Sequence, residues 1–215
     1  MEKIKIPKYT LAEELINAIS HGFGTAFAIT ALVLTVVISA KHHSAIAVVS
    51  SCIYGSSMII MFLISCLYHS FSPKLKAKKV FRVLDHCDIY VFIAGSYTPF
   101  CLCLIGGLKG WLMFGVIWIC TVIGILLNSI DMDRFEKPSF VLYLIMGWMI
   151  ILSLDVLLAK LPTAALVLLI SGGVVYTLGS AFYIIGAKRK YLHSVFHFFI
   201  LIAAILQFFS ILYVI

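Results

Sequence analysis

Charged residues are scarce in this sequence. Only 12% of its 215 residues are Asp, Glu, Lys or Arg, whereas 63% are hydrophobic and the mean hydropathy is +1.13. A water-soluble globular domain usually carries about 25% charged residues. The composition therefore excludes a water-soluble fold.

Paired cysteine motifs are also absent. Six cysteines are present, all within or at the edge of apolar runs: Cys52, Cys66, Cys87, Cys101, Cys103 and Cys120. None belongs to a CxxC pair or lies in a loop, which argues against a disulfide framework and against a cysteine-ligated zinc site. We expect these side chains to act as small apolar filler.

Long apolar runs recur along the whole chain. A bilayer core of about 30 Å requires roughly 20 mostly apolar residues per helix. We identify seven such segments, at residues 14–40, 44–69, 83–105, 111–130, 140–158, 164–185 and 193–215. The first run is too long for a signal peptide and lacks a small-residue cleavage site, so we expect it to be a span. The sequence predicts an all-α membrane protein in which residues 1–215 form a single domain, a seven-transmembrane helix bundle.

The loops between these segments are short and differ in charge. One side of the membrane collects 13 basic residues: Lys3, Lys5, Lys8, Lys74, Lys76, Lys78, Lys79, Arg82, Arg134, Lys137, Lys188, Arg189 and Lys190. The other side has only Lys41, Lys109 and Lys160, and together they account for all 16. The positive-inside rule then predicts a cytoplasmic N-terminus and an outside C-terminus. The net charge of +7 is explained by this topology and by attraction to anionic lipids, without a nucleic-acid partner.

Polar residues gather at the predicted cytoplasmic ends of four spans. Nine of them lie at similar depth: Glu14, Asn17, His21, His69, Asp85, His86, Asp88, His193 and His197. Ionisable side chains inside a membrane cost several kcal/mol unless they are paired or solvated, so each is a functional candidate. The predicted outer halves are poorer in such groups.

The most specific element is His193-x-x-x-His197. Residues at i and i+4 share one face of a helix, so both imidazoles can reach the same ion. His69 lies at the matching depth and is the expected third ligand. Three histidines that leave a fourth position for water are typical of a catalytic zinc site, where the pKa of bound water falls to about 7. In this hypothesis Asp85 is a hydrogen-bond acceptor or general base, and Ser65 a hydrogen-bond partner.

Other polar residues have competing packing interpretations. A single histidine near a membrane interface commonly packs or snorkels, and this alternative holds for His21 and His86. Asp88 lies one turn beyond Asp85 and either joins the site or pairs with His21 or His86. The role of Glu14 stays open.

Three further expectations concern structure alone. His42 and His43 are expected in an exposed outer loop. Asp155 is expected to snorkel or to pair with Lys160, and Pro99 to kink the third span. Gly172-Gly173 and Gly179-Ser180 in the sixth span should allow close helix approach.

These motifs together resemble the hemolysin III family of bacterial membrane proteins, which is related to progestin and adipoQ receptors and more distantly to alkaline ceramidases. The resemblance covers essentially the whole chain. Its carriers are Glu14-x-x-Asn17-x-x-x-His21, Ser65-x-x-x-His69, Leu84-Asp85 with residues 94–100 after it, and His193-x-x-x-His197. It implies a multi-pass protein of the bacterial cytoplasmic membrane with seven helices.

The resemblance also implies an intramembrane zinc held by His69, His193 and His197, with Asp85 orienting the zinc-bound water and Ser65 beside it. It leaves the activity open among three classes. The first is a zinc-dependent hydrolase of a lipid amide or ester, whose partner is a membrane lipid. The second is a sensor or regulator of membrane state with a structural zinc. The third is a pore-forming or cytolytic protein, which would need polar residues along a full transmembrane path.

Overall fold

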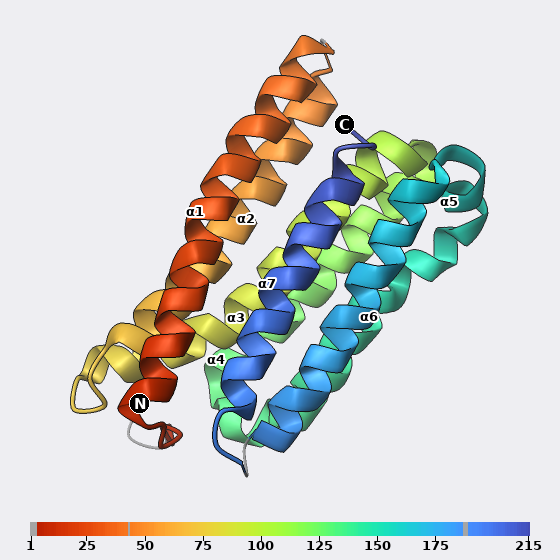
Figure 1. Cartoon of the computed structure of the whole chain (residues 1–215). Coiled ribbons are helices and arrows are strands. Elements are labelled where there is room, and N and C mark those ends of the chain that lie inside the picture. The colour runs from red at the N-terminus through yellow and green to blue at the C-terminus, as the bar shows by residue number, and fades with distance from the viewer. Residues whose placement is uncertain (1–3, 43, 187–188) are drawn as a thin grey trace.

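A computed structural model describes residues 4–42, 44–186 and 189–215 (Figure 1). The expectations for Lys3, His43 and Lys188 concern residues outside these ranges. The described residues form helices and no strands. In chain order the elements are α1 (Leu11–Lys41), α2 (Ala45–Ser70), α3 (Lys76–Pro99), η1 (Phe100–Ile105), α4 (Gly107–Trp148), η2 (Met149–Ser153), α5 (Leu154–Lys160), α6 (Thr163–Gly186) and α7 (Leu192–Ile211).

Local sequence sets the beginnings of the first two helices. Thr10 and Glu13 form a capping box: the Glu13 N–H donates to Thr10 Oγ1 at 3.3 Å, and the Thr10 N–H donates to Glu13 Oε2 at 2.9 Å. Ser44 caps α2 by accepting from the Ala47 N–H at 3.2 Å. Both helices therefore begin close to the predicted start of their spans.

The third helix begins earlier than the sequence pattern indicated. α3 starts at Lys76 rather than at Val83, so most of the basic run interpreted as a loop is helical. Lys78 explains the difference, because its side chain is fully buried and its Nζ lies 2.5 Å from Glu14 Oε1 of α1. A lysine can enter the interior when a carboxylate pairs with it.

The interpretation of residues 131–139 as a loop is likewise corrected, since they form a kink within α4. Asp131 has non-helical backbone angles, φ −158° and ψ 91°, and helix resumes after it. The two halves pack together, because Ser139 Oγ donates to Asn128 Oδ1 at 2.7 Å and Lys109 Nζ lies 2.8 Å from Asp155 Oδ1. Residues 107–130 and 139–160 therefore run alongside each other in opposite directions.

Six helical stretches in the described part of the chain are long and apolar enough to cross a membrane. They are residues 11–41, 45–70, 76–105, 107–160, 163–186 and 192–211. The fourth has 54 residues, far more than the roughly 20 that one crossing needs, and it is the stretch that doubles back. The beginning of α1 and the end of α7 lie at opposite ends of the bundle (Figure 1). The structure is thus a membrane helical bundle, and seven crossings with a cytoplasmic N-terminus remain our prediction.

Small residues bring neighbouring helices together in the sixth span, as predicted. A Cβ placed on Gly172 would meet Gln207 Cγ at 3.0 Å, and one on Gly179 would meet Phe199 Cβ at 2.9 Å. Pro99 ends α3, and the chain continues as the π-helical segment η1. The Thr98 hydroxyl there donates to the Ala94 carbonyl at 2.8 Å.

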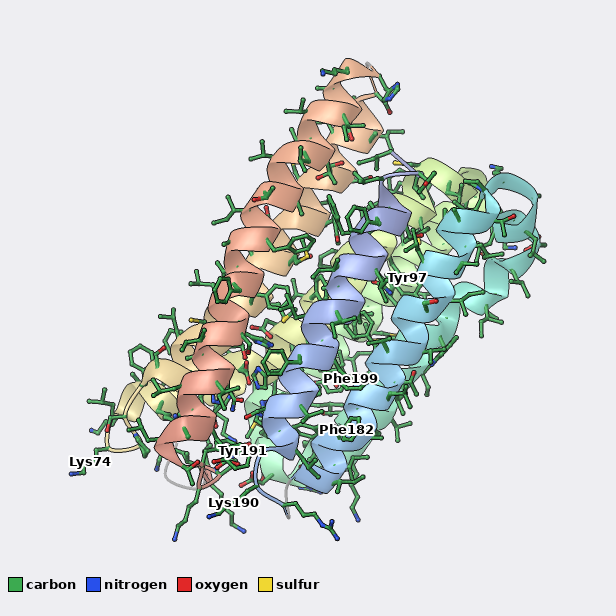
Figure 2. All side chains as sticks on the ribbon, in the orientation of Figure 1. Lys74, Tyr97, Phe182, Lys190, Tyr191 and Phe199 are labelled. Carbon is green, nitrogen blue, oxygen red and sulfur yellow. The ribbon has the colours of Figure 1, made fainter. Side chains whose placement is uncertain are left out.

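The two ends of the bundle differ in their charged residues. Lys74 and Lys190 lie at the end where α1 begins (Figure 2). At the other end Asp155 pairs with Lys109, which corrects one of the two alternatives for Asp155, the pairing with Lys160. Lys160 instead donates to the Leu104 carbonyl at 2.7 Å, because its Nζ reaches the last turn of η1. His42 is exposed at the end of α1, as expected.

Candidate metal centre

Three histidines from two helices converge near the basic end of the bundle. His69 comes from the last turn of α2, and His193 and His197 come from the first two turns of α7. All three are buried, and one ring nitrogen from each lies within 4.8 Å of the others. Nε2 of His193 lies 3.1 Å from Nε2 of His197. The spacing of the histidines along the sequence thus predicted their gathering in space.

The start of α7 is tied to the start of α1. Tyr191, the residue before α7, has a left-handed backbone with φ 64°. Its N–H donates to Glu13 Oε1 at 2.7 Å, while the other oxygen of Glu13 caps α1. One carboxylate therefore fixes where both helices begin, and this contact places His193 and His197 beside α1.

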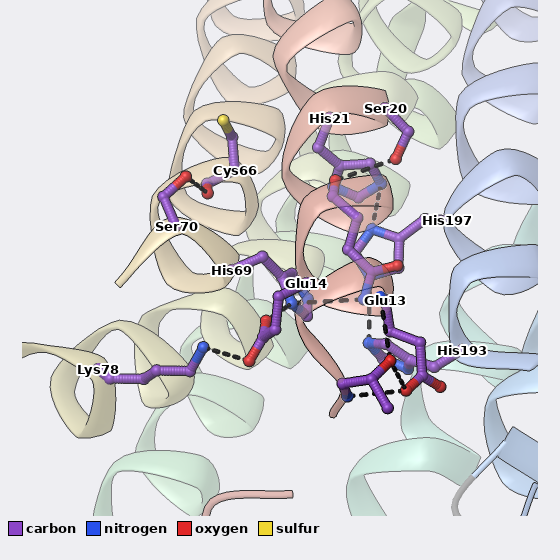
Figure 3. A network of polar contacts seen from close by, with 12 residues as sticks. Glu13, Glu14, Ser20, His21, Cys66, His69, Ser70, Lys78, His193 and His197 are labelled. Carbon is purple, nitrogen blue, oxygen red and sulfur yellow. Dashed lines mark hydrogen bonds and ion pairs between the residues drawn. The ribbon is translucent and has the colours of Figure 1, made fainter. Parts of the chain in front are cut away.

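A chain of polar contacts surrounds His69 (Figure 3). Its Nδ1 lies 2.7 Å from Glu14 Oε2, and Glu14 Oε1 receives Lys78 Nζ at 2.5 Å. Asn17 Nδ2 lies 3.4 Å from the same Nδ1. His69 Nε2 is buried and has no hydrogen-bond partner among the described residues. The ring is therefore held from one side and leaves its other nitrogen available.

The α7 histidines have their own neighbours. His197 Nδ1 lies 2.9 Å from His21 Nε2 of α1. Tyr9 stacks on His193, with ring centroids 4.8 Å apart and an interplanar angle of 17°. Burial raises the pKa of the Tyr9 hydroxyl above its usual range, so the phenol stays protonated. The packing role considered for His21 is therefore a direct contact with His197, one of the candidate ligands.

Asp85 and Ser65 lie near the three histidines without forming hydrogen bonds to them in the described structure. Both line the cavity that His193 and His197 also line, and Ser65 is buried in its wall. Asp85 Oδ2 lies 4.0 Å from His86 Nδ1. No hydrogen bond joins either side chain to the three histidines within the described ranges. Their predicted roles beside a zinc-bound water therefore remain proposals.

His86 and Asp88 do not join the cluster. His86 Nδ1 lies 2.9 Å from the Arg82 carbonyl, and its Nε2 lies 3.2 Å from the Tyr183 hydroxyl, so both nitrogens are engaged elsewhere. Both carboxylate oxygens of Asp88 are buried without a partner in the described part of the chain. The alternative in which Asp88 pairs with His21 or His86 is therefore wrong, because neither Asp88 oxygen forms a hydrogen bond to those rings.

A cavity of about 190 Å³ extends from His193 and His197 between α2, α3, α4, α6 and α7. On α3 it is lined from Arg82 to Tyr97, a distance of about 22 Å at 1.5 Å rise per residue. Its end near the cluster carries acidic, basic and imidazole groups. Its deeper wall is largely apolar and aromatic, and includes Phe92, Leu144 and Trp148. The shape and polarity suit a long apolar tail with a polar group at one end.

The donor set fits a zinc ion. Tetrahedral zinc with Zn–N bonds of about 2.0–2.1 Å separates its nitrogen ligands by about 3.3–3.4 Å, close to the 3.1 Å between the α7 histidines. His69 Nε2 supplies a third nitrogen, buried and unpartnered in the described structure. His69, His193 and His197 could therefore hold a metal ion.

Sequence reasoning missed Lys78 and Tyr9. Lys78 was counted as one of the basic loop residues. Lys78 lies two helical turns before Asp85 and so shares a helix face with it. This spacing was the one sign in the sequence that Lys78 belongs near the site. Tyr9 precedes the first span, and no pattern marked it.

Comparisons with known proteins agree with the motifs. A family model described as "Haemolysin-III related" matches residues 9–208. "Hemolysin-3" of Bacillus cereus is 37% identical over 212 residues, covering 99% of this chain and 96% of that protein. "Hemolysin-3 homolog" of Bacillus subtilis (strain 168) is 38% identical over 205 residues, 95% of each chain. The human "Monocyte to macrophage differentiation factor" is 26% identical over 215 residues, 95% of this chain and 85% of that protein. The inferred resemblance is confirmed: this chain belongs to the haemolysin-III-related family of membrane proteins.

Proposed function

We propose that this chain is a zinc-dependent hydrolase of the membrane that acts on a lipid amide or ester entering from the cytoplasmic leaflet. The observation that carries the proposal is a cluster of three convergent histidines, two of which, His193 and His197, line the polar end of a long, largely apolar cavity. His69, His193 and His197 are the proposed ligands. When bound, zinc polarises a carbonyl and lowers the pKa of water to about 7.

The chain's own residues supply the remaining chemistry. Asp85 faces the cavity from α3, where its carboxylate can accept a proton from the attacking water and pass it to the leaving amine or alkoxide. Ser65 faces the same cavity from α2, where its hydroxyl can donate to the oxygen that becomes negative as the carbonyl is attacked.

Substrate binding follows from the cavity's lining. The deep apolar wall accommodates an acyl tail. Arg82, Asp133 and Glu136 line the cavity at its charged end and are placed to contact a polar headgroup. Arg82 also contacts the Lys5 carbonyl and lies 3.5 Å from Asp133 Oδ1, which holds its guanidinium near the cavity's charged end.

A direct test compares purified variants in lipid nanodiscs. Wild type is incubated with a panel of lipid amides and esters, and released fatty acid is measured by mass spectrometry. Asp85→Asn is expected to lower turnover by at least 10²-fold, the usual effect of losing a general base, while retaining bound zinc. Asp155→Asn, a matched change at the far end of the bundle, should leave turnover unchanged. No turnover by zinc-loaded wild type on any member of the panel would refute the hydrolase proposal.

A second candidate is a sensor or regulator in which the metal only ties α2 to α7. The observation favouring it is that Asp85 forms no hydrogen bond to the histidines within the described residues. In that case His69→Ala would lower the melting temperature strongly, and Asp85→Asn would match wild type in every assay. A pore is not favoured, because the cavity's deeper lining is apolar and gives no continuous polar path.

A further inference from the structure

We propose that α1, which supplies none of the candidate ligands, sets the tautomers of two of them. Glu14, held by Lys78, keeps the proton of His69 on Nδ1, and His21 keeps the proton of His197 on Nδ1. Each Nε2 is thereby left as a lone pair directed at the same point. The His197 tautomer and the consequence for metal binding rest on the proposed zinc site, whereas the His69 tautomer does not.

The Glu14 contact decides the state of His69. An ionised carboxylate only accepts hydrogen bonds, so the imidazole nitrogen 2.7 Å from Glu14 Oε2 must carry the proton. The opposite nitrogen, Nε2, then has a free lone pair, and it is the buried atom without a partner in the described structure. Asn17 Oδ1 is also buried and unpartnered. Exchanging the oxygen and nitrogen of the Asn17 amide would give the Nδ1–H a second acceptor.

Lys78 keeps Glu14 ionised and in place. Its side chain is fully buried, its Nζ contacts Glu14 Oε1 at 2.5 Å, and the ammonium lies 4.9 Å from the centroid of the Tyr68 ring. A buried ammonium stabilises the negative form of its partner carboxylate. The arrangement corresponds to the carboxylate–histidine pairs that surround metal sites, with a lysine added behind the carboxylate.

His21 occupies the equivalent position for His197. It lies two helical turns after Glu14 on α1, so both side chains project from one face. Its Nε2 lies 2.9 Å from His197 Nδ1, and its own Nδ1 is buried without a partner in the described ranges. We assign the His21 proton to Nδ1 because Nε2 then accepts from His197 Nδ1–H, which leaves His197 Nε2 free to bind the proposed metal.

The first experiment reads the tautomer without any metal. Metal-free protein labelled with ¹⁵N-histidine is studied by solid-state NMR, with His69 assigned through His69→Asn. Wild type should show His69 protonated at Nδ1, and Glu14→Gln should give a mixture or the Nε2–H form. Wild-type His69 protonated at Nε2 would overturn the proposal, whatever the protein proves to catalyse.

The second experiment measures Co²⁺ affinity by the intensity of its visible absorption bands. Glu14→Gln should weaken Co²⁺ binding about 10–100-fold, the usual effect of losing such a partner. Because Glu14→Gln strands the Lys78 charge and threatens folding, the double variant Glu14→Gln/Lys78→Met is measured beside it. If Lys78 acts through Glu14, the double variant should lose no more affinity than Glu14→Gln alone.

Matched controls separate orientation from general ion-pair loss. Asp155→Asn and Lys109→Met remove the partners of an exposed pair with a 2.8 Å contact at the other end of the bundle, and they should leave the affinity unchanged. His21→Leu should weaken binding, and His21→Asn, which keeps an acceptor, should restore part of it. Wild-type affinity and spectrum in a folded Glu14→Gln variant would overturn the proposal. Absence of Co²⁺ binding by wild type, with the Nδ1 tautomer intact, would refute the metal site instead.

Discussion

The hydroxyl of Tyr97 on α3 forms hydrogen bonds with both ends of one turn, at Gly147 and at Ile150. It donates to the Gly147 carbonyl at 2.9 Å and accepts from the Ile150 N–H at 2.9 Å. The turn lies where α4 gives way to the 3₁₀ segment η2. Tyr97 thereby joins α3 to this turn, whose Gly147 lines the cavity.

Tyr97→Phe should destabilise the protein by about 1–3 kcal/mol, because it removes two hydrogen bonds that each contribute about 0.5–1.5 kcal/mol. The measurement is the unfolding midpoint in a detergent titration followed by circular dichroism. Tyr213→Phe is the control, since that side chain is exposed near the end of the chain. Equal midpoints for the two variants would show that the Tyr97 contacts contribute nothing.

Gly173→Leu should shorten the cavity without disturbing the fold. A Cβ on Gly173 would lie 3.5 Å from the Trp148 ring, an ordinary contact distance, and both residues line the cavity. We expect affinity for long-chain lipid amides to fall at least tenfold while short-chain amides bind as before. Native mass spectrometry across a chain-length series provides the measurement. Gly115→Leu, whose Cβ would meet no atom within 4 Å, is the control. A uniform change at every chain length would contradict the assignment of the cavity to the tail.

Gly95→Ala should loosen the packing of α3 against α2. The new Cβ would lie 2.7 Å from Ser57 Cβ, closer than side chains tolerate, so the helices must separate. Overpacking of this kind typically costs about 1–3 kcal/mol. The thermal midpoint should fall relative to Gly115→Ala, and a second change, Ser57→Gly, should restore it. Failure of Ser57→Gly to restore stability would contradict this origin.

Metal removal should lower stability if the three histidines bind zinc. Elemental analysis of wild type should find stoichiometric metal, and His193→Ala should remove it. At a free concentration 100 times the Kd, a bound ion stabilises the folded state by about 2.7 kcal/mol. The thermal midpoint of wild type should therefore fall on treatment with a chelator, and that of His193→Ala should not respond. A chelator response in both proteins would place the metal elsewhere.

The sidedness of the bundle can be measured by cysteine labelling. In a background where the six cysteines are replaced by alanine, Lys74→Cys and Lys109→Cys are treated in intact cells with a membrane-impermeant maleimide. The charge distribution predicts labelling at position 109 and protection at position 74. The opposite pattern would invert the topology, and labelling at both positions would show that the two lysines share a side.

Much of the fold was predictable because bilayer thickness and backbone hydrogen bonding restrict the alternatives. The lengths of the apolar runs predicted where the helices lie, and the polar and glycine- or proline-containing segments predicted most of the boundaries between them. The break at Asp131 was placed correctly but expected as a loop, since hydropathy cannot show that helical geometry resumes after one residue. Lys78 was misinterpreted for a related reason: a lysine that faces water and one that is paired inside look identical in a charge count.

The candidate site was predictable in its histidines and not in their surroundings. The i, i+4 spacing of His193 and His197 fixed their shared face, and the depth of His69 indicated the third member. Which helix lies against those rings depends on packing between spans, and periodicity within one span carries no such information. The contacts of Glu14 with His69 and of Glu13 with Tyr191 therefore emerged only from the structure.

Glu13 and Glu14 are consecutive, yet they serve different neighbours. Adjacent residues on an α-helix project about 100° apart, so Glu13 reaches the start of α7 while Glu14 reaches α2 and α3. The first turn of α1 thus connects the start of α7 on one side with α2 and α3 on the other. A one-residue insertion between Glu13 and Glu14 would change the angle between the two carboxylates, so that only one of them could keep its present contacts. The three histidines would then lose their common alignment.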